Sequence, residues 1–214
     1  MKSETCLNTD LYCITAEKLS RGRSNIQVVR EMLAAGIRII QYREKEKSMM
    51  ARYQECEEIR KLTREYGATF IINDHVDLAL AVDADGVHIG QEDLPIEVVR
   101  SLAGDELLIG VSTHSPEEAE DAVRRGADYI AIGPIFRTTT KENAGEPVGL
   151  EYLEYVAKNV DIPLVAIGGI TEENILDVYR AGARCISLVS EIVGAEDIGA
   201  KIASLRRKLG MATE

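Results

Sequence analysis

Short apolar runs alternate with amphipathic stretches along almost the whole chain. The apolar runs have the length and the β-branched content of strands, and the stretches between them have the periodicity of helices. We predict eight strands, at residues 11–15, 37–43, 69–73, 86–90, 107–112, 128–133, 163–168 and 184–190. The predicted helices cover 25–35, 49–66, 76–82, 95–103, the stretch capped by Ser115, 150–159, the stretch behind 171–174, and 195–208.

A corner of small residues recurs where a predicted helix ends before a strand. It reads Ala35-Gly36, then Gly126-Ala127, then Ala181-Gly182-Ala183. This repetition indicates one βα unit copied around a ring, so we predict an α/β fold, a (β/α)8 TIM barrel. A single domain is expected over 1–214, with about 1–10 as a short N-terminal extension. A doubly wound open sheet is the alternative, because strand number alone does not prove closure.

Composition narrows the classes of function. The 214 residues carry a formal net charge of −11 at pH 7, so we expect no nucleic-acid or membrane partner. An anionic substrate would need locally gathered cations or a metal. The cysteines form no C-x-x-C pair, and no segment reaches the length of a signal-peptide core or membrane span. We predict a cytoplasmic protein that acts on small molecules, and a homo-oligomer is left open.

Two aspartates follow neighbouring predicted strands. Asp74 ends the run 69–74 and Asp93 follows the run 86–90. In a parallel sheet both carboxylates would emerge at the same rim, where one Mg²⁺ could bridge them and share substrate phosphates. Each aspartate also has a simpler interpretation as the N-cap of the helix that follows it. Only the pair together indicates a metal site.

Other polar groups are predicted at the same rim, where barrel enzymes build their active sites. Arg43 and Lys45 follow the second strand, although the run 43–47 could equally be a solvated charged segment. Gly168-Gly169 and Val189-Ser190 stand where barrels bind phosphate through backbone N–H groups, unless the glycines serve only a tight turn. The long loop 138–145 indicates a lid that binds an anion.

The three histidines do not indicate a zinc site. His75, His88 and His114 form no H-x-x-x-H pair and no cluster with cysteine. His88 alternates within a strand and is interpreted as structural, whereas His114 at the rim is either functional or a surface residue.

Several motifs in order resemble those of the thiamine-phosphate synthase family. They are QYREK at 41–45, IND at 72–74, ADGVHIGQED at 84–93, GVSTH at 110–114, GPIFRTTTK at 133–141 and AIGGI at 166–170. The likeness spans roughly 11–193. It implies a (β/α)8 transferase that joins 4-amino-5-hydroxymethyl-2-methylpyrimidine diphosphate to 4-methyl-5-(2-phosphoethyl)thiazole, releases pyrophosphate and uses Mg²⁺.

The resemblance also implies residue roles. The pyrimidine diphosphate would be bound by Gln41, Tyr42, Arg43, Glu44, Lys45, Asn73, Ser112 and Lys141. Catalysis is expected from Arg43, Lys45, Ser112 and Lys141. The thiazole phosphate would be bound by Thr138, Thr139, Thr140, Gly169, Val189 and Ser190, and the metal by Asp74 and Asp93.

Two rival functions and two departures from the family pattern accompany this prediction. A thiazole tautomerase would need a histidine near the sixth strand, where this chain has Gly133-Pro134. A non-catalytic phosphate-binding barrel would need only one anion site. His75 stands where arginine is common in the family, and Arg184, Cys185 and Ser187 replace small residues expected in the eighth strand.

Overall fold

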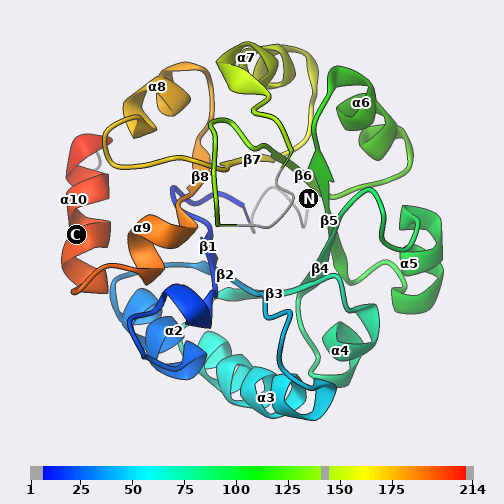
Figure 1. Ribbon diagram of the computed structural model, residues 1–214. Helices are drawn as coiled ribbons and strands as arrows, with labels where there is room; N and C mark the ends of the chain where they lie inside the picture. Colours follow the sequence, from blue (N-terminus) through cyan, green and yellow to red (C-terminus); the bar gives the residue numbers. More distant parts are fainter. Residues whose placement is uncertain (1–6, 141–144, 211–214) are drawn as a thin grey trace.

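A computed structural model describes residues 7–140 and 145–210, and shows a closed barrel of eight parallel strands (Figure 1). Strands pair in sequence order, and the first and eighth meet through the parallel bridge Leu11–Ile186, with Tyr12 N donating to Ile186 O at 3.0 Å. This closure confirms the barrel over the open sheet. The strands are β1 Cys13–Ile14, β2 Ile39–Tyr42, β3 Thr69–Asn73, β4 Gly86–Ile89, β5 Leu108–Thr113, β6 Tyr129–Ile132, β7 Leu164–Ile167 and β8 Cys185–Ser187.

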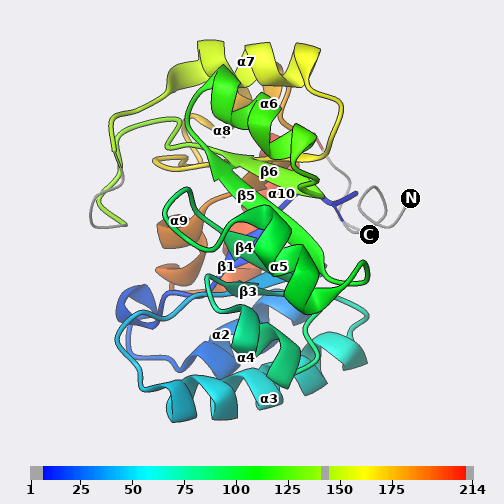
Figure 2. The ribbon, with the colours of Figure 1, turned by 90° about the vertical axis from the view of Figure 1, so that its right-hand side faces the viewer.

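The predicted helices surround the barrel in order, together with two short ones that were not predicted, η1 and α9 (Figures 1 and 2). They are η1 Glu17–Leu19, α2 Asn25–Ala34, α3 Met49–Glu65, α4 Val76–Ala81, α5 Ile96–Ala103, α6 Pro116–Arg124, α7 Gly149–Asn159, α8 Ile175–Arg180, α9 Val189–Val193 and α10 Ile198–Lys208. Serine side chains cap α2, α3 and α6, each accepting from a backbone N–H three residues on. No helix in the described part of the chain is long and apolar enough to cross a membrane.

The predicted eighth strand was too long. β8 ends at Ser187, and Val189 and Ser190 lie in the first turn of the short helix α9. An apolar run of this length does not separate a strand from a strand followed by a buried helical turn, because both bury the same residue types. The two residues nevertheless remain at the predicted rim.

The core has two layers, set by the alternation of side chains along each strand. One layer packs between the barrel and its helices and includes Val87, Ile109 and Ile130. The other fills the barrel interior and includes Tyr12, Ile71 and Tyr129. The described cysteines Cys13, Cys56 and Cys185 are buried free thiols, and burial raises the pKa of each thiol.

Candidate active site

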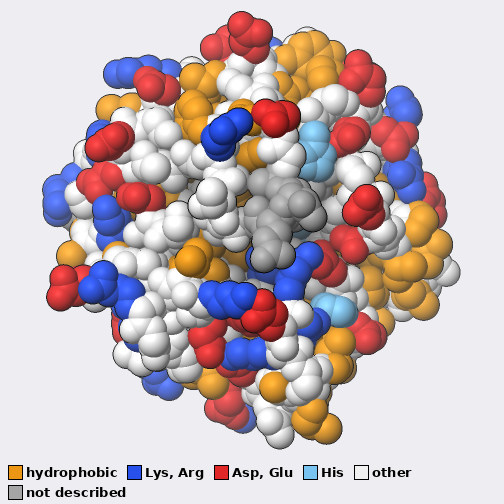
Figure 3. Space-filling view, viewed as in Figure 1, with side chains coloured by type: hydrophobic (Ala, Val, Ile, Leu, Met, Phe, Trp, Pro, Cys, Tyr) orange, Lys and Arg blue, Asp and Glu red, His pale blue; other side chains and the backbone are white. Residues whose placement is uncertain are grey.

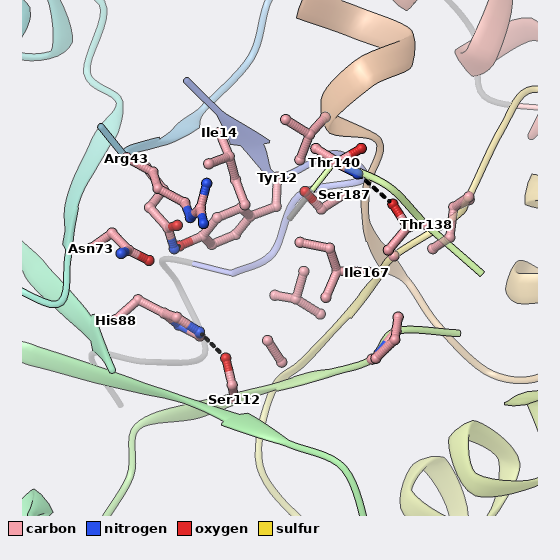
Figure 4. A pocket seen from close by; sticks show the side chains of 18 of the residues that line it. Tyr12, Ile14, Arg43, Asn73, His88, Ser112, Thr138, Thr140, Ile167 and Ser187 are labelled. Carbon is pink, nitrogen blue, oxygen red and sulfur yellow. Dashed lines mark hydrogen bonds between the residues drawn. The ribbon is translucent and has the colours of Figure 1, made fainter. Parts of the chain in front are cut away.

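A pocket opens at the carboxyl ends of the strands. It is lined by nine of the predicted site residues: Gln41, Arg43, Asn73, Ser112, Thr138, Thr140, Gly169, Val189 and Ser190. Figure 4 shows Arg43 and Asn73 on one side and Thr138 and Thr140 on the other, with Ile167 between them. Lys and Arg side chains gather on this face of the molecule toward α2 and α3 (Figure 3). The pocket therefore carries polar side chains on two sides, with the apolar side chain of Ile167 among the residues between them.

The segment that follows β2 is held in place by its backbone. Thr15 Oγ1 accepts from Arg43 N at 2.8 Å, and Arg52 of α3 donates to the carbonyl of Lys45 at 2.9 Å. Lys47 bridges Glu17 and Glu55 with 2.5 Å contacts and is only partly exposed. The solvated-run interpretation of 43–47 is therefore wrong for Lys47, which fixes the loop that presents Arg43 and Lys45.

Tyr42 and Glu44 do not reach the pocket. The Tyr42 hydroxyl donates to Glu55 Oε2 at 2.6 Å on the outer side of the strand. Glu44 Oε1 accepts from Glu17 N at 2.9 Å and from the side-chain amide of Asn25 at 3.0 Å. The structure thus separates these two residues from the predicted substrate-binding group, because alternate positions of a strand face opposite sides. Both brace the loop from behind.

Asp74 and Asp93 come together at the rim, as the prediction of a metal site requires. Neither caps a helix: His75 is the N-cap of α4 and Pro95 that of α5, so the capping interpretations are wrong. Burial raises the pKa of Asp74, and the adjacent Asp93 carboxylate raises it further, against the opposing charge of Lys45. Lys45 Nζ lies 3.7 Å from Asp74 Oδ2. Lys45 and Arg43 both oppose this rise of the Asp74 pKa without cancelling it, so the two neighbouring carboxylates are only partly compensated.

Backbone geometry fixes both carboxylates. Asp74 has φ +63°, a left-handed conformation that aspartate tolerates better than most residues. Its N–H donates to the His88 carbonyl at 2.8 Å. Asp93 Oδ2 accepts from Gly90 N at 2.7 Å, which leaves its other oxygen for a further partner. Strained backbone at a rim position is typical of functional sites. The described residues contain no group of three or more His, Cys, Asp or Glu side chains that could hold a metal.

The other polar end lies between β6 and α9. Gly168 and Gly169 have φ +98° and +65°, and a Cβ on Gly169 would lie 2.6 Å from the carbonyl oxygen of Phe136. The positive φ angles agree with a tight turn, but the turn is not the only role open to the glycines, because Gly168 and Gly169 both line the pocket. Thr139 is exposed and outside the lining, and Lys141 lies outside the described residues.

The comparisons with known proteins agree with one another. The family model described as thiamine monophosphate synthase matches residues 11–192. The chain belongs to this family. It is 61% identical over 200 residues to the thiamine-phosphate synthase of Pelotomaculum thermopropionicum, covering 94% of this chain and 92% of the relative. A thiamine-phosphate synthase of Caldicellulosiruptor saccharolyticus is 56% identical over 196 residues, covering 92% and 89% of the two chains.

A solved structure extends the likeness to three dimensions. The thiamine phosphate pyrophosphorylase from Pyrococcus furiosus superposes with a TM-score of 0.88 at 41% identity, covering 96% of this chain and 98% of that one. The predictions of an enzyme of the thiamine monophosphate synthase family, a transferase, and of its barrel are confirmed. The residue roles stay predictions.

The family pattern did not identify all the pocket residues. His88, interpreted as structural, lines the pocket and contacts Ser112 Oγ at 3.0 Å. Tyr12, Tyr129 and Ser187 also line it. Ser187 Oγ is buried and has no hydrogen-bond partner among the described residues. Strand alternation could have found them: Tyr12 and Ile14 share a face with the barrel interior, as do Tyr129 and Ala131.

The other two histidines differ in position, since His114 lines the pocket and His75 does not. His75 contacts Arg52 of α3. An arginine side chain therefore lies beside position 75, where the family often has an arginine. His114 lines the pocket, and its Nδ1 lies 2.9 Å from Glu118 Oε2.

Proposed function

We propose that this protein is a thiamine-phosphate synthase that joins the pyrimidine diphosphate to the thiazole phosphate. The observation that carries this proposal is one pocket with two polar ends: Arg43 and Asn73 on one side, and Thr138, Thr140 and Gly169 on the other. A single-anion binder needs only one such end. The family membership supports the same function.

The reaction breaks one bond and forms another without moving a proton. The bond between the methylene carbon of the pyrimidine and the diphosphate oxygen breaks, and its electron pair leaves with pyrophosphate. The neutral thiazole nitrogen then supplies the pair for the new carbon–nitrogen bond. Because the nucleophile carries no proton, no general base is needed, and catalysis consists of positioning and charge stabilisation.

Arg43 and Lys45 would neutralise the departing diphosphate. Arg43 projects into the pocket from the braced end of β2, and Lys45 lies farther out, beside the Asp74 carboxylate. Gln41 and Asn73 would orient the pyrimidine, since both amides line the wall from which Arg43 extends. The Ser112 hydroxyl, on β5, would donate a hydrogen bond to the departing diphosphate. Lys141 keeps the diphosphate role that the family resemblance gives it.

The residues at the rim fit a magnesium ion. Asp74 and Asp93 supply two carboxylates whose mutual repulsion a divalent cation would relieve. Two protein ligands suit Mg²⁺, which completes its octahedron with waters and substrate phosphates. When bound there, Mg²⁺ would stabilise the negative charge of the leaving pyrophosphate.

The thiazole phosphate would occupy the opposite end. Thr138 and Thr140 would offer hydroxyls, and Gly169, Val189 and Ser190, which line the same end, would offer backbone N–H groups. Ile167, between the two ends, gives an apolar surface on which the rings could pack. This arrangement would hold the thiazole nitrogen toward the methylene carbon. Thr139 is exposed and has only the resemblance in its favour.

The deciding experiment incubates the purified protein with both substrates and Mg²⁺. We expect thiamine phosphate and pyrophosphate in equal amounts, and no product when either substrate is omitted or the metal is chelated. Absence of product at saturating substrate would refute the synthase. Isomerisation of a thiazole precursor in its place would support the tautomerase, although Gly133-Pro134 occupies the position where that enzyme needs a histidine.

A further inference from the structure

Five buried or half-buried polar side chains form a continuous line beneath the pocket. Gln41 Nε2 lies 2.9 Å from the Tyr12 hydroxyl, which lies 2.8 Å from the Tyr129 hydroxyl. The Tyr129 hydroxyl lies 3.1 Å from His88 Nδ1, and His88 Nε2 lies 3.0 Å from Ser112 Oγ. Figure 4 shows the last contact at the pocket wall. The line crosses the barrel from β2 to β5 through the residue before β1 and through β6 and β4.

The chemistry of the two ends gives this line a direction. The amide nitrogen of Gln41 can only donate, so the Tyr12 hydroxyl accepts from it. The Tyr12 hydroxyl lies within hydrogen-bond distance of Tyr129, and Tyr129 within that of His88 Nδ1. Every proton of the line has an acceptor within it only if Tyr12 donates to Tyr129 and Tyr129 donates to His88 Nδ1. A neutral imidazole that accepts at Nδ1 carries its proton on Nε2, which then donates to Ser112 Oγ. The Ser112 proton is thereby left to point into the pocket.

We propose that Gln41, Tyr12, Tyr129 and His88 form a one-way hydrogen-bond chain that keeps Ser112 as a donor toward the departing diphosphate. Tyr12, Tyr129 and His88 are then positioning residues that act through Ser112. This inference rests on the proposed function for the identity of the anion, but the direction of the chain does not depend on it. In the reverse order Tyr12 would accept from both Gln41 and Tyr129, and its own proton would have no acceptor within the line.

Burial and packing support a fixed chain. Burial raises the pKa of both Tyr12 and Tyr129, so both phenols keep the proton that each must donate. The Tyr129 ring fills space left by Gly110, where a Cβ would lie 2.0 Å from the ring carbon that bears the hydroxyl. The backbone of Ser112 is held separately, because the Gln91 amide donates to its carbonyl at 2.7 Å. A buried polar line in which every member is bonded is costly to interrupt.

The first test reads the histidine tautomer by ¹⁵N NMR of the substrate-free protein. We expect His88 to be neutral, with a proton on Nε2 and none on Nδ1. The other two histidines are assigned with His75→Asn and His114→Asn variants. A proton on Nδ1, or an imidazolium at neutral pH, would overturn the proposal. This readout needs no activity, so it stands even if the protein makes no thiamine phosphate.

The second test is a double-mutant cycle. Tyr129→Phe should lower kcat about tenfold with KM for the pyrimidine diphosphate changed less than about twofold, the size expected for one weakened transition-state hydrogen bond. In a Ser112→Ala background, the same substitution should cost nothing further. An equal loss in both backgrounds would contradict the chain.

Tyr152→Phe is the matched control. It removes another buried tyrosine hydroxyl, one bonded to Thr113 Oγ1 at 2.9 Å outside the pocket lining. Its kcat should stay at the wild-type value. If Tyr152→Phe lowered kcat as much as Tyr129→Phe, the loss would come from disturbed packing in general, and the proposal would be overturned.

Discussion

Charged side chains are arranged differently at the two ends of the barrel. At the amino ends of the strands, Asp10, Asp85 and Asp128 are paired with arginines and backbone N–H groups. At the carboxyl ends, two carboxylates face each other, and Arg43 projects into an open pocket. The paired charges contribute to stability, whereas the poorly compensated charges are available to a ligand. This division of stability and chemistry between the two faces is typical of TIM barrels.

The same set of contacts, between an aspartate, an arginine and a backbone N–H group, occurs twice at the amino end. Asp85, just before β4, accepts hydrogen bonds from both terminal nitrogens of Arg60, at 2.8 and 2.9 Å, and from the N–H of Phe70 at 2.8 Å. Asp128, just before β6, accepts from Arg100 at 2.7 Å and from the N–H of Ile109 at 2.8 Å. Each aspartate thus ties a strand to its neighbour and to a helix. The Asp85–Arg60 pair is bidentate, the stronger form of such a contact, whereas Arg100 donates to Asp128 through one nitrogen.

The largest expected effect is the loss of turnover in Arg43→Ala. Removing a cation aimed at the departing diphosphate should lower kcat by about 10²- to 10³-fold, as for other donors to transition-state anions. The midpoint of urea unfolding should change little, because the side chain lies in the open pocket. Arg60→Ala is the reciprocal control and should destabilise the fold while keeping kcat. If Arg43→Ala and Arg60→Ala changed kcat equally and the unfolding midpoint equally, the two ends of the barrel would not differ in function.

The second effect concerns the paired carboxylates. Asp74→Asn should raise the Mg²⁺ concentration for half-maximal activity about 10- to 100-fold, since a metal ligand is lost. Asparagine tolerates the left-handed backbone at this position, so the fold should persist. Thiazole-phosphate affinity should stay within about twofold in a calorimetric titration.

The control for this variant is Asp77→Asn, which changes an exposed carboxylate three residues away in the first turn of α4. It should leave the Mg²⁺ response unaltered. If Asp74→Asn kept the wild-type dependence of activity on Mg²⁺, Asp74 would not be a metal ligand, and the proximity of Asp74 and Asp93 would have no role in metal binding.

A third substitution tests the amino end directly. Asp85→Asn should lower the free energy of unfolding by about 2–3 kcal/mol, because it removes a bidentate pair and leaves Arg60 partly buried without its partner. Turnover should be unchanged. Asp83→Asn, which breaks the exposed pair with Arg64, should cost less than about 0.5 kcal/mol. If Asp83→Asn lowered the free energy of unfolding more than Asp85→Asn, burial would not explain how much each ion pair stabilises the fold.

The sequence predicted the architecture and most of the pocket because both follow from periodicity and position. The strand ends alone place Gln41, Arg43, Asn73 and Ser112 in one pocket. It could not exclude Tyr42 and Glu44, since a motif quoted as a continuous string contains residues that face both sides of the strand. The helical turn at Val189 was also hidden within an apolar run.

The polar line under the pocket lies beyond such reasoning for a different reason. His88 and Tyr129 are 41 positions apart, and their contact depends on barrel closure and on the space left by Gly110. Only the three-dimensional structure brings those residues into one line. The pairing of Asp10 with Arg206, 196 positions apart, is another example.

That pair gives the smallest effect, a change of stability with pH. Burial raises the pKa of Asp10, but the hydrogen bonds and charge of Arg206 outweigh it and hold the pKa below its ordinary value of 3.8. A carboxyl whose pKa is lower in the folded state stabilises the protein above its unfolded pKa, and this contribution is lost as pH falls through the folded value. Asp10→Asn should therefore be less stable than wild type by about 1.5 kcal/mol at pH 7. The gap should shrink steadily below about pH 4.

Urea unfolding of both proteins from pH 7 down to pH 3 measures this gap. Asp177→Asn, which breaks an exposed pair with Arg180, should show almost no gap at any pH. A gap between Asp10→Asn and wild type that stays constant as the pH falls would mean that Asp10 stabilises the barrel by packing and not by its charge. The amino end would then owe its stability to shape, and charge would distinguish only the end that holds the pocket.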